Sequence, residues 1–222
     1  GSAAASDIIT IDANTNGHIT GTGITAFTGT AANIATVIGT EGTAGQANKI
    51  ELDSDFTATV DAGSVAAADL NTISAATGGT VTATAATAIT GTSTAVAAVV
   101  ADSQITVAAD YDVTLTGSAA ASDIISIDAD TTGHITAANV TALTGTAANV
   151  ATVVGTDGSA GTANKISLDT DYNVTLTGSA AAADIITIDA NTSGHITAAN
   201  VTALTGTAAV SYTHLRAHET LG

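Results

Sequence analysis

The sequence predicts a repeat solenoid, mainly a parallel β-solenoid with short helical turns between its strands. Three observations predict it. The element Leu-Thr-Gly-Ser/Thr-Ala-Ala recurs along the chain, alanine and threonine fill 94 of 222 positions, and stretches of alternating apolar and polar residues recur with the element. A short unit of this kind cannot bury its apolar face alone, so it has to stack on its neighbours.

The glycine of the recurring element sets the period of the chain. Successive landmark glycines are 28, 34, 28, 26, 28, 33 and 28 residues apart, and the longer intervals carry a loop such as 155–162. We therefore expect residues 1–209 to form about four units of 54–62 residues, each made of two half-repeats. Because the chain opens within a repeat, we expect it to be a fragment. The landmarks are Gly1, Gly29, Gly63, Gly91, Gly117, Gly145, Gly178 and Gly206.

Each half-repeat predicts one or two short elements. Residues 113–116 and 174–177 read Val-Thr-Leu-Thr, which is typical of a half-buried strand. Residues 146–155 have valines at i, i+3 and i+4, so they predict a two-turn helix with Thr146 as N-cap and Gly155 as the C′ cap. The same spacing occurs at Ile34, Val37 and Ile38 and at Val96, Val99 and Val100. For residues 123–127, β-branched side chains favour a strand, but the counterpart with Leu70 and Ile73 favours a short helix, which we expect.

Composition excludes several classes of protein. Aromatic residues are 2% of the chain, and proline, cysteine, methionine and tryptophan are absent. We therefore exclude a core of large side chains, a disulfide scaffold, a thiolate metal site and a cysteine nucleophile. The net charge of −17 repels phosphate backbones, so nucleic acid is not expected as a partner. No apolar run approaches the roughly 20 residues of a membrane span, so no membrane insertion is expected.

The residues Asp-Leu-Asn-Thr-Ile-Ser-Ala-Ala-Thr-Gly-Gly-Thr-Val at 69–81 and Ala-Leu-Thr-Gly-Thr-Ala-Ala-Asn-Val at 142–150 carry a resemblance to a known group. They resemble the Ala/Thr/Asp-rich tandem repeats of very large secreted and surface proteins of cyanobacteria and other aquatic bacteria, some found beside RTX-type calcium-binding modules. The resemblance covers residues 1–209 and implies an extracellular or cell-surface, structural or adhesive role. The RTX signature Gly-Gly-x-Gly-x-Asp is absent, so calcium binding does not follow from the resemblance.

The C-terminal residues 210–222 depart from the repeat. They contain the only arginine and two of the five histidines, and residues 210–220 resemble one translated reading frame of a transposase adapter used in shotgun sequencing. We therefore expect the authentic sequence to stop near Ala209, with 210–222 a non-native, disordered tail. A metal pair of His214 and His218 is correspondingly not expected.

Three segments match the first eight positions of a calcium-binding loop, at residues 12–19, 128–135 and 189–196. Position 12, which needs a bidentate Glu, is Gly23, Asn139 and Asn200 instead. An Asx-type turn is therefore the favoured interpretation, with low-affinity Ca²⁺ binding as the alternative and no other cofactor expected. Asp-x-Asp at 53–55 and 169–171 could add oxygen ligands. The candidate ligands are Asp12, Asn14, Asn16, Asp128, Asp130, Asp189 and Asn191.

His18, His134 and His195 occupy one slot in three units, and we expect them to be solvated turn residues. They recur too far apart to share one metal ion, whose ligand bonds are about 2 Å long. Serine, histidine and aspartate all belong to repeating slots, whereas a catalytic triad needs one unique arrangement. We therefore expect no enzyme.

Two functions from different classes remain. The first is a structural spacer or adhesive stalk segment of a large extracellular bacterial protein, whose partners are flanking repeats of the same chain and an unidentified surface or carbohydrate ligand. The second is a threonine-rich solenoid that binds ice or another regular surface, indicated by Thr-x-Thr pairs, although such pairs also suit any solvent-facing strand. A calcium-stabilised RTX-associated repeat and a phage fibre segment are further alternatives. The pairs are Thr57/Thr59, Thr82/Thr84, Thr114/Thr116 and Thr175/Thr177.

Overall fold

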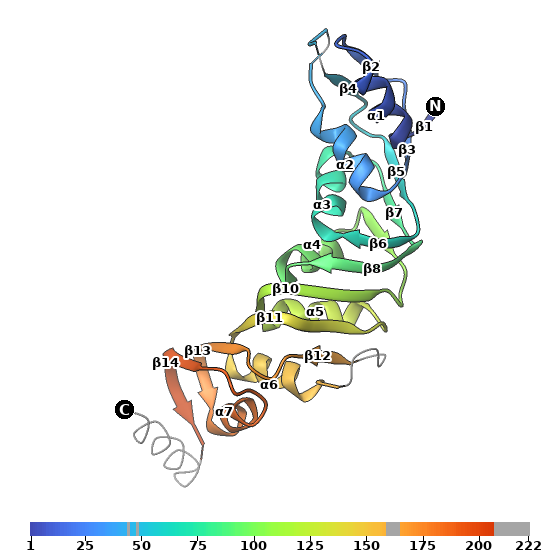
Figure 1. Ribbon diagram of the computed structural model, residues 1–222. Helices are drawn as coiled ribbons and strands as arrows, with labels where there is room; N and C mark the ends of the chain where they lie inside the picture. Colours follow the sequence, from blue (N-terminus) through green and yellow to red (C-terminus); the bar gives the residue numbers. More distant parts are fainter. Residues whose placement is uncertain (44, 48, 159–164, 207–222) are drawn as a thin grey trace. The chain divides into compact units, whose positions relative to one another are not determined.

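The computed structural model describes residues 1–43, 45–47, 49–158 and 165–206 (Figure 1). It is an α/β fold in which helices follow strands of open, parallel sheets. The described residues form seven helices, and no sheet among them closes on itself. The prediction of a mainly β solenoid is therefore wrong. Segments expected as short turns are helices of 8–10 residues, which is consistent with their alanine content, since alanine has the lowest cost in a helix.

The chain divides into two compact units, one comprising Gly1–Gly91 with Ala95–Asp112 and the other Thr92–Thr94 with the chain from Val113 onward. No helix in the described ranges is both long and apolar enough to cross a bilayer. The predicted tail 210–222, and residues 159–164 of the predicted loop, lie outside the described residues.

The elements of the first unit alternate from the start. In chain order they are β1 (Ser2–Ala4), α1 (Ala5–Ala13), β2 (Ile19–Gly21), β3 (Ala26–Gly29), α2 (Ala31–Gly39), β4 (Ile50–Leu52), β5 (Thr57–Val60), β6 (Gly63–Ala66), α3 (Ala67–Ala76), β7 (Val81–Ala83), β8 (Ala86–Gly91), α4 (Ser93–Ala101) and β9 (Ile105–Val107). One parallel sheet has the order β1-β3-β5-β7-β9, while β6 pairs with β8 and β2 with β4. Helix α2 packs between α1 and α3 (Figure 1).

The second unit repeats this alternation with longer strands. Its elements are β10 (Asp112–Ala120), α5 (Ala121–Asp130), β11 (Ile135–Gly145), α6 (Ala147–Gly155), β12 (Ile166–Leu168), β13 (Asn173–Ala181), α7 (Ala182–Asp189) and β14 (Ile196–Thr205). Its parallel strands follow the order β10-β11-β13-β14, with β12 also paired to β11. Helix α6 packs between α5 and α7.

The core contains large side chains after all. Phe27, Phe56, Tyr111 and Tyr172 are each about 1% exposed and are the largest fully buried side chains of the described residues. The rings of Phe27 and Phe56 meet edge to face, with centroids 5.1 Å apart. The expectation that a low aromatic content excludes such a core was therefore wrong, because the few aromatic residues are concentrated at buried positions between helices and sheets otherwise filled by Ile, Val, Leu and Ala.

The landmark glycines have backbone conformations that other residues rarely adopt. Gly29, Gly63, Gly91, Gly117, Gly145, Gly178 and Gly206 all have positive φ, between 74° and 155°. At Gly145, φ is +149°, so a side chain there would be strained by the backbone, although an added Cβ would make only an ordinary contact of 3.4 Å with the Cβ of Ala121. The period seen in the sequence therefore marks a recurring backbone turn that glycine adopts readily.

The predicted helices and strands are confirmed locally. Residues 113–116 and 174–177 lie in β10 and β13, and residues 123–127 lie in α5. Thr146 is the N-cap of α6, and its hydroxyl accepts a hydrogen bond from Asn149 N–H. The predicted C′ role of Gly155 was wrong, because Gly155 is the last helical residue and Thr156, with φ −95°, is the C-cap.

Gly155→Ala directly tests whether Gly155 is a helical residue or a C′ cap. The residue is helical, and an added Cβ would have no neighbour within 4 Å, so alanine is expected to raise the unfolding free energy by about 0.5–1 kcal/mol. A C′ glycine in the left-handed conformation would instead give a loss. Equilibrium denaturation of the two proteins, with the strained Gly145→Ala as the destabilised control, distinguishes the two results.

Candidate functional site

A row of four threonines crosses the five-stranded sheet of the first unit. The strand register aligns Thr28 with Thr59, Thr59 with Thr82, and Thr82 with Thr106. Neighbouring strands lie about 4.8 Å apart, so the four side chains repeat at that interval. Thr28, Thr59 and Thr106 are exposed and Thr82 is half-buried, whereas the preceding residues Phe27, Ala58, Val81 and Ile105 form an aligned buried row.

The four hydroxyls of this threonine row make no hydrogen bond to another described group, so they are available to an external partner. A shorter row in the second unit aligns Thr144, Thr175 and Thr197, all half-buried. In the sequence, the pairs Thr57/Thr59 and Thr82/Thr84 suggested only a sparse row, because the members of each pair follow one another along the chain and do not lie on neighbouring strands. The register between strands adds Thr28 and Thr106, which are not members of those two pairs.

The seven candidate calcium ligands are not gathered around one point. Asp128 and Asp130 both lie in α5, two residues apart, and side chains at that spacing point to different faces of a helix. Asp12 lies in α1, and Asp189 is the last residue of α7. Asn16 is exposed on the turn that follows α1.

The two remaining candidates bind their own helices. The side-chain amides of Asn14 and Asn191 donate to the carbonyls of Thr10 and Thr187, at 2.7 and 2.8 Å. In the described ranges, no group of three or more His, Asp or Glu side chains is placed to hold a metal ion. Calcium binding at these residues stays a prediction.

The turns themselves are closed by threonine. Thr15, Thr77, Thr131 and Thr192 each accept, through the side-chain hydroxyl, the N–H of the glycine two residues later, at 2.9–3.0 Å. The Thr77 hydroxyl donates to the Phe56 carbonyl, and that of Thr192 donates to Tyr172 O at 2.6 Å. An Asx-type turn was the expectation, whereas a threonine hydroxyl makes the equivalent bond.

Two carboxyl groups have perturbed acidity. Burial raises the pKa of Asp128, against the opposing charge of Lys165. The pKa of the exposed Asp55 is raised because its protonated carboxyl donates a hydrogen bond to the neighbouring carboxylate of Asp53 and because the negative charge of Asp53 disfavours ionisation. The second case shows that the Asp-x-Asp pair at 53–55 brings its two carboxyl groups together.

The three histidines differ in their surroundings. His134 is 5% exposed, so the expectation of a solvated turn residue was wrong there. The Nε2 atom of His18 lies 3.4 Å from a carboxylate oxygen of Glu51, and its Nδ1 atom lies 3.2 Å from Gln46 O. His195 is exposed and its ring contacts the Thr197 hydroxyl at 3.1 Å.

A serine–carboxylate pair joins the end of α3 to the segment before β9. Ser74, 5% exposed, donates to a carboxylate oxygen of Asp102 at 2.6 Å, and Gln104 N–H donates to the other at 2.9 Å. The Gln104 amide then donates to the carbonyls of Thr77 and Gly79, both at 3.2 Å. These bonds link the end of α3 to the segment before β9.

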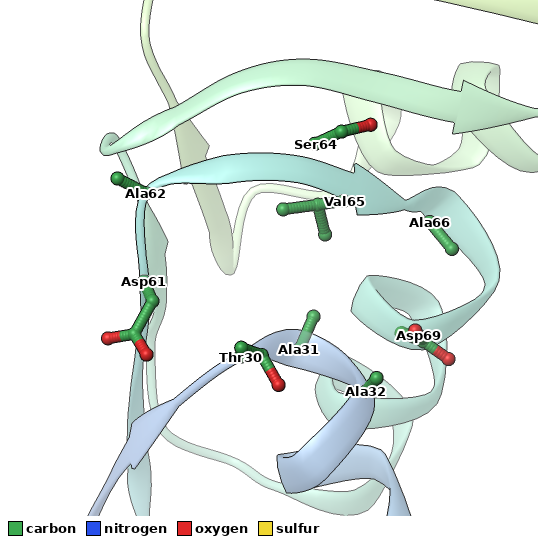
Figure 2. A pocket seen from close by; sticks show the side chains of 9 residues that line it. All are labelled: Thr30, Ala31, Ala32, Asp61, Ala62, Ser64, Val65, Ala66 and Asp69. Carbon is green, nitrogen blue, oxygen red and sulfur yellow. The ribbon is translucent and has the colours of Figure 1, made fainter.

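A small cavity of about 80 Å³ lies near the N-termini of α2 and α3 (Figure 2). Asp61 and Asp69 lie at its two ends, and the side chains of Ala31 and Val65 face each other across it. Ligand pockets for organic molecules usually measure about 300–1,000 Å³. The cavity is therefore too small for a substrate of ordinary size.

The hydroxyl of Tyr172 has a perturbed acidity. Burial, together with the charge of Asp157, raises the pKa of its hydroxyl to about 12. The unfolded chain, with an ordinary tyrosine pKa of about 10, releases its proton first, so stability is present below pH 10 and declines as the pH rises toward 12. Absorbance of the phenolate should show one high-pH transition that Tyr172→Phe removes. If the variant instead loses a transition near pH 10, this prediction is contradicted.

Comparisons with protein-family models, with curated proteins and with solved structures give no significant match for this chain.

The sequence analysis did not identify the aromatic and threonine residues that organise these turns. Phe56, Tyr111 and Tyr172 each stand two residues before an apolar strand residue, and that spacing was a signal available in the sequence. The serine–carboxylate pair of Ser74 and Asp102 had no such signal, because its members occur once each and lie 28 residues apart.

Proposed function

We propose that this chain is a structural, non-catalytic segment, a spacer or adhesive stalk portion of a large extracellular bacterial protein. The observation that carries the proposal is that one local arrangement occurs several times: an aromatic residue before a strand, a threonine-closed turn, and a landmark glycine with positive φ. A catalytic site needs one distinct arrangement of groups, whereas a structural segment is extended by repeating the same arrangement many times.

Charge and contacts support the same proposal. The net charge of −17 disfavours nucleic acid as a partner, and the resemblance to large surface proteins favours an extracellular position with flanking segments of the same chain as neighbours. The polar clusters described above hold elements together, as Ser74 and Asp102 do, and are buried or engaged in turns.

Deleting one period tests the spacer proposal. Removing residues 117–177 joins Thr116 to Gly178 and rebuilds the shared strand sequence Val-Thr-Leu-Thr-Gly-Ser-Ala-Ala. Because the chain has no cysteine, dyes can be attached at Asp7→Cys and Ser179→Cys, both exposed positions. A spacer is expected to stay folded while the distance between the dyes falls.

The control deletion of residues 117–172 joins Thr116 to Asn173, which duplicates half a strand instead of restoring the pattern. It is expected to lose cooperative unfolding by circular dichroism. An unchanged dye distance in the 117–177 deletion, with the protein still folded, would overturn the spacer proposal.

The threonine row favours a second candidate, binding to a regular surface such as ice. Its support is the unbroken alignment of Thr28, Thr59, Thr82 and Thr106 with hydroxyls that bond no described group. Shaping of ice crystals and thermal hysteresis are expected for the unaltered protein and should be lost in Thr59→Lys, at the middle of the row. The exposed Ser6→Lys on α1 is the matched control. An unaltered protein without any effect on ice growth would exclude this candidate.

A further inference from the structure

Asn16 is followed by a glycine, which is true of no other asparagine in the sequence. It lies on the turn that joins α1 to β2, and both Asn16 and Gly17 are exposed to solvent. The side chain of Asn16 ends in a carboxamide, and the next backbone nitrogen belongs to a residue without a Cβ. That nitrogen can therefore approach the carboxamide carbon Cγ without steric crowding from a side chain of its own.

The exposure of this position is a property of the turn. Four turns are closed by a threonine hydroxyl that accepts the N–H of the glycine two residues later, and the residue between them is exposed in each. The turn that contains Thr132 leads into β11, which is paired on both edges, so the exposure persists where neighbouring strands are present. Only the first of the four turns has a carboxamide at this position. The four residues are Asn16, Gly78, Thr132 and Ser193.

Hydrogen bonds separate Asn16 from the nearest asparagine in the chain. The side-chain amide of Asn14 donates to the carbonyl of Thr10 at 2.7 Å, which holds it against α1. The carboxamide of Asn16 makes no hydrogen bond to another residue in the part of the chain that the structure describes. It can therefore rotate toward the backbone nitrogen that follows it.

The nitrogen of Gly17 is itself engaged. Its N–H donates to the hydroxyl oxygen of Thr15 at 2.9 Å. The nitrogen has to lose this proton before it can attack a carbon atom, and the hydrogen bond stabilises the protonated form. The Thr15 hydroxyl is thus placed to slow any reaction between Gly17 and the side chain of Asn16.

We propose that Asn16 is a site of spontaneous covalent modification, at which the backbone nitrogen of Gly17 displaces ammonia from the Asn16 side chain at a rate that the Thr15 hydroxyl restrains. The nitrogen gives up its proton to a solvent base and forms a bond to Cγ of Asn16. The bond between Cγ and Nδ2 breaks, and Nδ2 leaves as ammonia with a proton from solvent. Because both reacting groups belong to one turn, the step is intramolecular and needs no second reactant.

Water completes the modification. One water molecule opens the resulting succinimide ring at either carbonyl group, which yields aspartate or isoaspartate at position 16. Each product adds one negative charge to a chain whose net charge is −17. Isoaspartate also adds one carbon atom to the main chain, so it lengthens the turn that leads into β2. The modification does not depend on the spacer role.

The test is incubation of the full chain at neutral pH and in mild alkali. Cleavage before aspartate releases residues 12–52 as one fragment, which tandem mass spectrometry then reads residue by residue. We expect aspartate and isoaspartate to accumulate at position 16, faster in alkali, while Asn14 in the same fragment stays intact. The chain unfolded in urea supplies the rate without the turn and its hydrogen bond.

Two variants separate the attacking nitrogen from the hydroxyl that restrains it. Gly17→Ala is expected to slow the conversion at least about tenfold, because a Cβ beside the nitrogen disturbs the geometry of an intramolecular attack. The added Cβ would meet only the end of the Thr15 side chain, at 3.1 Å, so the variant is expected to fold. Thr15→Val is expected to accelerate the conversion about two- to tenfold, the factor that corresponds to one net hydrogen bond.

Thr15→Ser is the matched control, because it keeps the hydroxyl and should convert at the rate of the unaltered chain. The modification site is overturned if Asn16 stays intact in the folded chain while the unfolded chain converts, or if Asn14 converts equally. Conversion in Thr15→Val that is no faster than in Thr15→Ser overturns the restraining role of the hydroxyl.

Discussion

Gly79→Ala is expected to destabilise the protein by at least about 3 kcal/mol, the joint cost of overpacking and of broken hydrogen bonds at about 1–3 kcal/mol each. An added Cβ at Gly79 would overlap the carbonyl oxygen of Phe56 and lie 2.8 Å from the carbonyl oxygen of Asp55. Both obstacles are backbone atoms, which cannot rotate away. Displacing them would also break the bonds that Thr77 makes to Gly79 N–H and to the Phe56 carbonyl.

Gly78→Ala is the control for this prediction, one residue away. An added Cβ there would lie 3.7 Å from Ser54 O, an ordinary contact, so its effect is expected to stay within about 0.5 kcal/mol. Both variants are compared by equilibrium denaturation of the full chain. Equal stabilities of the two variants would show that the Phe56 backbone does not exclude a side chain at position 79. Gly194→Ala repeats the test at Tyr172, where the added Cβ would overlap the carbonyl oxygen.

Local elements and the period were predictable from the sequence because each depends on few residues. Valine spacing in residues 146–155 predicted α6, and the Val-Thr-Leu-Thr stretches predicted parts of β10 and β13. The landmark glycines were found by repetition alone, and their positive φ explains why glycine occupies these positions. The role of Gly155 was assigned wrongly, since a glycine that ends a helix and one that follows it look alike in sequence.

The prediction of the fold class was wrong because sequence periodicity does not determine how strands and helices are arranged within one unit. β-branched runs such as Ile124 and Ile125 suit a strand as well as a helix, and tertiary packing decided for α5. The candidate calcium ligands, which stay a prediction, show a related difficulty. Asp128 and Asp130 match a loop in sequence, but a helix that extends through Asp130 turns them to different faces. The threonine row became visible only once strand register was known.

Phe56→Ala is expected to lower the unfolding free energy by about 3–5 kcal/mol, the usual cost of removing a buried aromatic side chain. Phe56 is 1% exposed and packs edge to face on Phe27. A domain is stable by only about 5–15 kcal/mol, so this one change removes a large share of that stability.

The conservative variant Phe56→Tyr separates the contribution of the aromatic ring from the effect of side-chain volume. Tyr111 and Tyr172 occupy the positions equivalent to Phe56, and the Tyr172 hydroxyl reaches the Asn191 carbonyl at 3.5 Å, so Phe56→Tyr is expected to be tolerated. A double-mutant cycle of Phe27→Leu and Phe56→Leu should give a coupling of about 0.5–1.5 kcal/mol for the edge-to-face pair. If Phe56→Ala costs no more than an exposed substitution, the aromatic residues do not anchor the first unit. If the cycle gives no coupling, burial alone holds them, because the ring contact then adds nothing to the area that each side chain removes from water.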